Sequence, residues 1–127
     1  MRLDRDLLRK ILFQVEELGN DPGHRIQGFS VPGYDRKVVT YHVWQLGEDQ
    51  YLRVQQVPEA DASGSYFAPI CLTPKGHDFL ESVRDEEIWN QTKEAARKGG
   101  AATIELLVEI SKAFLRKQIE QRTGITL

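Results

Sequence analysis

The sequence predicts a single α+β domain over residues 1–127, in which helices flank a two-stranded hairpin. Three observations predict this class: helical apolar patterns near both ends of the chain, two short alternating segments in the middle, and turn-forming residues between those segments. Of the 127 residues, 40% are hydrophobic and 28% are charged. This composition is typical of a chain that buries one core and argues against general disorder.

The first predicted element is an amphipathic helix over Asp4 to Leu18. Asp4 or Asp6 can cap its start, and the glycine and proline that follow Leu18 can end it. A short strand over Arg25 to Phe29 and a turn at Pro32-Gly33 come next. The apolar residues that define the helix repeat on one face: Leu7, Leu8, Ile11, Leu12, Val15 and Leu18.

A second helix is predicted from Asp35 to Glu48, because Val39, Val43 and Leu46 recur at helical spacing. Two predicted strands follow, "QYLRVQQVP" and "YFAPICL", and the turn over Glu59 to Ser65 joins them into a hairpin. Together these elements form a predicted core over residues 1–73.

The remaining residues, 74–127, are predicted to form a long bent helix and a C-terminal amphipathic helix. Thr73-Pro74 has the residue types of a helix start, and Asp85 can provide a second cap where the helix bends. Lys98-Gly99-Gly100 ends this helix. The last helix is expected from Thr103 to Arg122. Its apolar side contains Ile104, Leu107, Val108, Phe114, Leu115 and Ile119.

A helix followed directly by a hairpin resembles the core of a winged helix, with the turn at Glu59 to Ser65 as the wing. "YHVWQLGEDQYL" resembles the end of a recognition helix, usually x-H-L-x-x-L-x-x-x-G-L, and "LTPKGHDFL" resembles the exit from the last wing strand, L-T-x-x-G-x-x-x-L. The chain departs from this pattern at two places. The helix usually found before the recognition helix is missing from Asn20 to Tyr34, and two acids occupy the turn after Leu46.

The whole chain also resembles a family of small, uncharacterised prophage-associated proteins. The shared features are a "RDLLRKIL"-like helix, Tyr41-His42, "LTxxGHDFL", the pattern R-D-[DE]-x-x-W at Arg84 to Trp89, and Gly99-Gly100. This resemblance implies a fold of winged-helix character and a phage or prophage setting. It implies no established activity.

The first functional hypothesis is sequence-specific binding of double-stranded DNA by a small phage or prophage regulator. If Val39, Val43 and Leu46 face the core, the opposite face of the helix is offered to the major groove. Trp44 and Glu48 fit that role poorly, and the wing tip is acidic. The expected DNA-binding residues are Arg36, Lys37, Thr40, Tyr41 and Arg53.

The alternative is a non-enzymatic protein-interaction module, an adaptor or inhibitor of a host or phage protein on the same scaffold. Aromatic side chains are favoured at interfaces, so Tyr41 and Trp44 are the candidate contact residues. A homodimer is also expected, with the C-terminal helix as its seam and Leu107 and Phe114 as contact residues.

Several functional classes are not expected. The net charge of -2 lacks the basic excess of a general nucleic-acid binder. The single cysteine, Cys71, excludes an internal disulfide and is expected in the core. His77, Asp78 and Glu81 lack the spacing of a metal motif and are interpreted as structural, so no enzyme, metal or cofactor is expected. A metal-assisted hydrolase that uses His77 is kept as a minor third hypothesis. The chain has no membrane-spanning segment or signal peptide and is expected in the cytoplasm.

Overall fold

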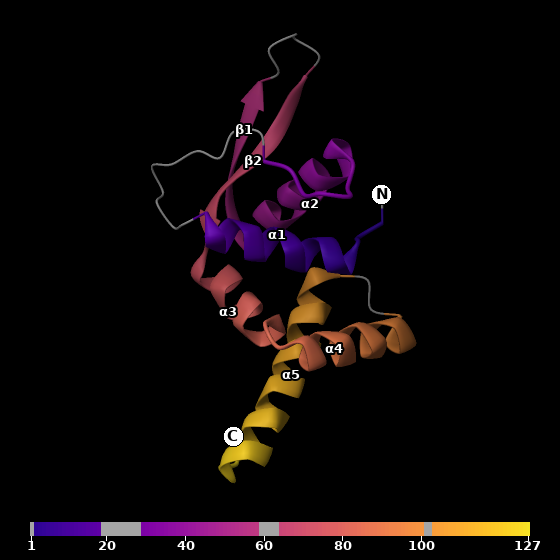
Figure 1. Ribbon diagram of the computed structural model, residues 1–127, viewed down its shortest axis with the longest axis vertical. Helices are drawn as coiled ribbons and strands as arrows, with labels where there is room; N and C mark the ends of the chain where they lie inside the picture. Colours follow the sequence, from indigo (N-terminus) through magenta and orange to yellow (C-terminus); the bar gives the residue numbers. More distant parts are fainter. Residues whose placement is uncertain (1, 19–28, 59–63, 101–102) are drawn as a thin grey trace. The chain divides into compact units, whose positions relative to one another are not determined.

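The computed structural model describes residues 2–18, 29–58, 64–100 and 103–127. Its elements confirm the predicted α+β class, and their order is compatible with a winged helix (Figure 1). In chain order they are α1 (Arg5–Glu17), α2 (Arg36–Glu48), β1 (Leu52–Pro58), β2 (Ser65–Leu72), α3 (Pro74–Val83), α4 (Glu86–Gly99) and α5 (Ile104–Thr123).

The chain divides into two compact units, residues 1–77 and residues 78–127. The first contains α1, α2, the hairpin and the start of α3, and the second contains the rest of α3 with α4 and α5. The single domain over residues 1–127 stays a prediction.

Helix α1 forms as its apolar pattern predicts. The Asp4 side chain caps the helix by accepting a hydrogen bond of 3.1 Å from the backbone N–H of Leu7. Leu18, predicted on the apolar face, is the C-cap residue and is 51% exposed. The other five predicted apolar residues are fully buried: Leu7, Leu8, Ile11, Leu12 and Val15.

The predicted hairpin is confirmed as an antiparallel pair. Its register runs from Leu52 opposite Leu72 to Pro58 opposite Ser65, with an irregularity between Arg53 and Val54. Most of the predicted wing turn, residues 59–63, lies outside the described residues. Residues 25–28 of the predicted short strand also lie outside them, and Phe29 is described but is not in a strand.

The turn between α2 and β1 explains one departure from the winged-helix phrase. Gln50 stands where that phrase usually has glycine, and it adopts a positive φ of 68°. Its carbonyl accepts a hydrogen bond of 2.5 Å from the Thr73 hydroxyl, and the Lys75 ammonium donates to the carbonyl of Asp49 at 3.0 Å. Gly76 is required here, because a Cβ would overlap the carbonyl oxygen of Tyr51.

The predicted long bent helix is instead two helices, α3 and α4. Asp85 separates them in an extended conformation, and its carboxylate accepts hydrogen bonds from the N–H groups of Glu87 (2.8 Å) and Ile88 (3.1 Å). The second cap predicted at Asp85 is therefore confirmed. Because a new helix begins directly after this cap, the helical pattern of the sequence continues across the break between α3 and α4.

In the second unit, α4 packs on α5. Gly100, at a φ of 71°, ends α4, and Thr103 caps α5 by accepting from the N–H of Leu106 at 3.2 Å. A buried hydrogen bond of 2.7 Å joins the hydroxyls of Ser82 and Ser111 and fixes α3 to α5. The side chains buried on the two packed helices include Ile88, Trp89 and Ala96 of α4 and Ile104 and Leu107 of α5.

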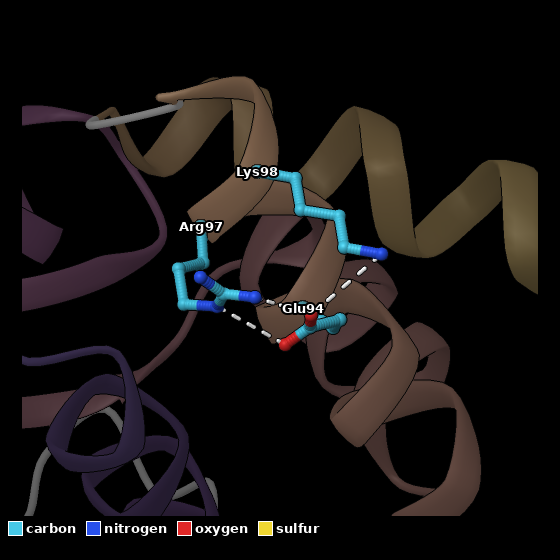
Figure 2. A network of polar contacts seen from close by, with 3 residues as sticks. All are labelled: Glu94, Arg97 and Lys98. Atoms are coloured by element: carbon cyan, nitrogen blue, oxygen red, sulfur yellow. Dashed lines mark hydrogen bonds and ion pairs between the residues drawn. The ribbon is translucent and has the colours of Figure 1, made fainter.

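An exposed polar network occupies the last turns of α4 (Figure 2). Arg97 approaches both carboxylate oxygens of Glu94, with its Nη2 2.6 Å from Oε1 and its Nε 3.2 Å from Oε2. The Lys98 ammonium is 3.8 Å from Oε1. Because all three side chains are more than half exposed, this network contributes little to the stability of the fold.

Candidate nucleic-acid interface

Helix α2 lies along the hairpin through a row of side chains that starts at its first residue. The Arg36 guanidinium lies over the ring of Tyr66, 4.5 Å from the ring centroid. One turn later, the Thr40 hydroxyl accepts a hydrogen bond of 2.8 Å from the backbone N–H of Phe67. These contacts fix the N-terminal half of α2 on strand β2.

The same row continues to the end of α2. The Trp44 ring is 6.4 Å from the ring of Phe67, centroid to centroid. Gly47 lies against Val54, where an added Cβ would come within 2.6 Å of a side-chain methyl group. The positions 40, 44 and 47 follow helical spacing, so one face of α2 is used to hold the hairpin.

This packing narrows the surface expected to contact DNA. The hydroxyl of Thr40 is bonded to the strand, and Trp44 is half-buried against it. The outward face of α2 retains Lys37 and Glu48, both exposed, and Tyr41, which is half-buried. The opposite face is confirmed as core, because Val39, Val43 and Leu46 are buried.

The predicted basic residues fall into two places. Arg36 and Lys37 are neighbours in the first turn of α2, and both are exposed. Arg53 is also exposed but lies at the other end of β1, opposite Cys71. Since Arg36 contacts Tyr66, whose strand partner Val57 is four residues beyond Arg53, the separation along the strand is about 13 Å.

Acidic groups share the end of unit 1 that carries Arg36 and Lys37. Asp35 is exposed directly before α2. Burial, and then the nearby carboxylates of Asp4 and Asp6, raise the pKa of the Tyr34 hydroxyl above its ordinary value. The Lys10 ammonium lies over the same ring at 5.3 Å. This end of unit 1 therefore carries both positive and negative charges.

Sequence reasoning missed the role of His42, which is fully buried. Its Nε2 accepts a hydrogen bond of 2.8 Å from the N–H of Asp4, and its Nδ1 lies 2.7 Å from the carbonyl oxygen of Val38. A backbone N–H can only donate and a carbonyl can only accept, so the ring is neutral with its proton on Nδ1. The available signal was its place between the core positions Val39 and Val43.

The residues that the sequence analysis interpreted as structural lie elsewhere. His77 is half-buried, and Asp78 and Glu81 are exposed on α3, where Glu81 pairs with Arg84 at 3.3 Å. Among the residues that the structure describes, no group of three or more histidine, cysteine or acidic side chains could hold a metal ion. Cys71 is buried, as predicted.

The two residues expected at a dimer seam have different surroundings. Leu107 is 1% exposed and is therefore not available to a second chain. Phe114 is half-buried. A seam along α5 would have to use residues other than Leu107.

Comparison of the sequence with known proteins identifies the family of this chain. The family model described as "Hypothetical protein (DUF2513)" matches residues 2–102. The chain belongs to this DUF2513 family. An uncharacterized protein of Haemophilus influenzae is 25% identical over 122 residues, which cover 95% of this chain and 98% of that protein. No solved structure matches the chain.

The DUF2513 match includes α2 and both strands, whereas α5 lies beyond it. The prediction of an uncharacterised family is thus confirmed. Within the described parts of this DUF2513 protein, no helix is long and apolar enough to cross a membrane.

Proposed function

We propose that this DUF2513 protein binds double-stranded DNA in the cytoplasm as a small regulator of phage or prophage genes. The observation that carries the proposal is the presence of three exposed basic residues, at two places, on one compact unit. Arg36 and Lys37 begin α2, and Arg53 lies near the opposite end of the hairpin against which α2 packs.

The spacing of these positions suits a duplex. The separation of about 13 Å along β1 is close to the major-groove width of about 12 Å. The first turn of α2 enters the groove in this arrangement, as helix N-termini do in helix-turn-helix proteins. Lys37 and Arg53 then contact the phosphates that border the groove, while Glu48 at the far end of α2 stays outside it.

The other predicted residues have indirect or smaller roles in this proposal. Thr40 positions α2 through its hydrogen bond to Phe67 and contacts no base. Tyr41, half-buried on the outward face, provides a hydroxyl at the groove edge. The acidic neighbours Asp4, Asp6 and Asp35 reduce the local positive potential, so we expect a modest affinity that falls further as salt is added.

A gel-shift assay at low salt tests the proposal, with the DNA upstream of the protein's own gene and a random duplex of equal length. Lys37→Glu is expected to weaken binding about tenfold or more, because it removes a phosphate contact and adds repulsion. Lys98→Glu is the charge-matched control, since Lys98 holds only an ion pair of 3.8 Å on α4. Absence of binding by the unchanged protein, or equal binding by Lys37→Glu, contradicts the proposal.

A second candidate function rests on an aromatic row that crosses from α2 to β2. The Tyr41 and Trp44 ring centroids are 5.9 Å apart, and Trp44 and Phe67 are 6.4 Å apart. All three rings are half-buried and so leave part of their surface to solvent. Rigid, partly exposed aromatic residues are typical anchors of protein interfaces, which supports an adaptor or inhibitor of a host or phage protein.

The two functions predict opposite results for two variants. In a pull-down from host lysate, Tyr41→Ala is expected to lose a specific partner that Lys37→Glu retains, if the aromatic row is the contact surface. DNA binding depends on Lys37 more strongly than on Tyr41. A specific partner bound equally by wild type and Tyr41→Ala would contradict the protein-interaction function.

A further inference from the structure

The outward face of α2 carries a stripe of side chains that the duplex interface uses only in part. Lys37, Tyr41, Trp44 and Glu48 recur at intervals of four, three and four residues. At about 100° per residue, the four positions fall within about 60° of one another around the helix. Lys37 and Glu48 are exposed, and the two rings between them are half-buried. Trp44 has no role in the duplex interface.

The aromatic row of Tyr41, Trp44 and Phe67 lies along this stripe and crosses onto β2. The Trp44 ring meets the Tyr41 ring at a tilt of 42° and the Phe67 ring at a tilt of 49°. At these tilts the rings do not stack face to face on one another. Because all three are half-buried, each ring keeps surface that its neighbours in the row do not cover.

These rings suit unpaired bases better than paired ones. In a duplex the base faces are stacked on one another, and the grooves present only the base edges. Unpaired bases expose their faces and stack on aromatic side chains. A single strand therefore provides the ring surface that the aromatic row would bind.

The lysine on the same stripe favours nucleic acid over protein as the ligand. Lysine is depleted at protein interfaces, whereas phosphates are bound by lysine and arginine. Lys37 lies one helical turn before Tyr41, and Lys37 and Trp44 are about 10 Å apart along the helix axis. A phosphate and the neighbouring bases thus each find a counterpart within a short length of α2.

We propose that the outward face of α2, together with Phe67, binds a short segment of single-stranded nucleic acid. Bases stack on the aromatic row, and Lys37 contacts a phosphate at the start of the helix. Glu48 repels phosphate, so the site ends at Trp44. Since every base has a face to stack, we expect little sequence preference. The site shares Lys37 with the proposed duplex interface, but it does not require duplex binding.

Fluorescence anisotropy of labelled oligonucleotides at low salt measures this binding. The ligands are a single-stranded thymidine oligonucleotide, its uridine counterpart and a duplex of the same length. Trp44→Ala is expected to weaken binding of both single strands about tenfold or more, and Trp44→Phe should restore most of it because the ring remains. Phe114→Ala is the control, since Phe114 is a half-buried ring on α5.

Tryptophan emission provides a readout that a purely structural role of Trp44 would leave unchanged. The chain has two tryptophans, and Trp89 is buried, so a base can stack only on Trp44. The thymidine strand should quench the emission of wild type. The emission of Trp44→Phe should stay constant although this variant still binds.

Three results would overturn the proposal. They are no binding of either single strand by wild type, equal binding of these strands by Trp44→Ala, and binding without a change in Trp44 emission. A duplex that binds when neither single strand does removes this inference and leaves the duplex function standing. Binding of the single strands without the duplex does the reverse. A Trp44-dependent protein partner, found without any oligonucleotide binding, would assign the row to protein contacts and also overturn the proposal.

Discussion

At the scale of single residues, the imidazole of His42 connects the start of α1 to α2. Its Nε2 accepts a part-buried hydrogen bond of 2.8 Å from the N–H of Asp4. An unsatisfied buried donor costs free energy because it has lost water without gaining a partner. His42 therefore has a structural role in the first unit.

We therefore expect His42→Leu to lower the free energy of unfolding by about 2 kcal/mol. His42→Gln is the matched comparison, because its side-chain oxygen can still accept from Asp4 and should preserve part of the stability. Urea denaturation followed by circular dichroism measures both. Equal stability of the two variants would show that the hydrogen bond contributes nothing.

Among the residues that the structure describes, Gln50 is the one non-glycine residue with a positive φ. A side chain in this conformation brings its Cβ close to the following carbonyl oxygen, which costs about 1 kcal/mol. Gln50→Gly should therefore raise the free energy of unfolding by up to about 1 kcal/mol. Gln50→Ala keeps the Cβ and should give no gain. A melting temperature that rises equally for both variants would contradict this explanation.

At the scale of elements, the break between α3 and α4 depends on Asp85. Hydrogen bonds from the N–H of Ile88, then from Gln118 and Glu87, with the charge of Arg122, hold the pKa of its carboxyl below the ordinary value despite partial desolvation. A lowered pKa in the folded state means that the ionised cap stabilises the fold above the pKa of the unfolded chain. That contribution is lost as the pH falls through the lower, folded-state pKa.

Asp85→Asn tests this cap, because asparagine can cap a helix but carries no charge. Wild type should be more stable than the variant at neutral pH, and the difference should shrink below a pH of about 4. Thermal melting from pH 7 to pH 2 measures the difference. Asp78→Asn, at an exposed position of α3, is the control. A difference that stays constant over this range would exclude the charge of Asp85 as the cause.

The sequence predicted the elements better than it predicted their faces. Regular apolar spacing correctly placed α1, α2 and α5, and alternation placed the hairpin. The periodicity of α2 also identified its core face. The periodicity could not show that Thr40 and Trp44 face the hairpin. A threonine or a tryptophan at such a position can contact either solvent or a strand, and the sequence is the same in both cases.

At the scale of the whole molecule, the fold class followed from local patterns, but the candidate site depends on long-range placement. Arg36, Lys37 and Arg53 were grouped by residue type, and the structure separates Arg53 from the others by most of a strand. The separation arises because the start of α2 contacts the end of the hairpin at Tyr66 and Val57, far from Arg53, and no local pattern in the sequence specifies how a helix lies along a hairpin. Long-range placement also decides the surroundings of Leu107: the sequence shows that the residue is apolar, but not that its own chain already buries it.

Binding of duplex DNA by α2 and the hairpin can be tested at the level of individual residues. The most direct test is a titration of the ¹⁵N-labelled protein with a DNA duplex at low salt, followed by amide chemical shifts. If this surface binds DNA, we expect the largest shift changes at Arg36, Lys37, Tyr41 and Arg53, with little change in α4. Absence of shift changes, or changes centred on residues outside α2 and the hairpin, would contradict it.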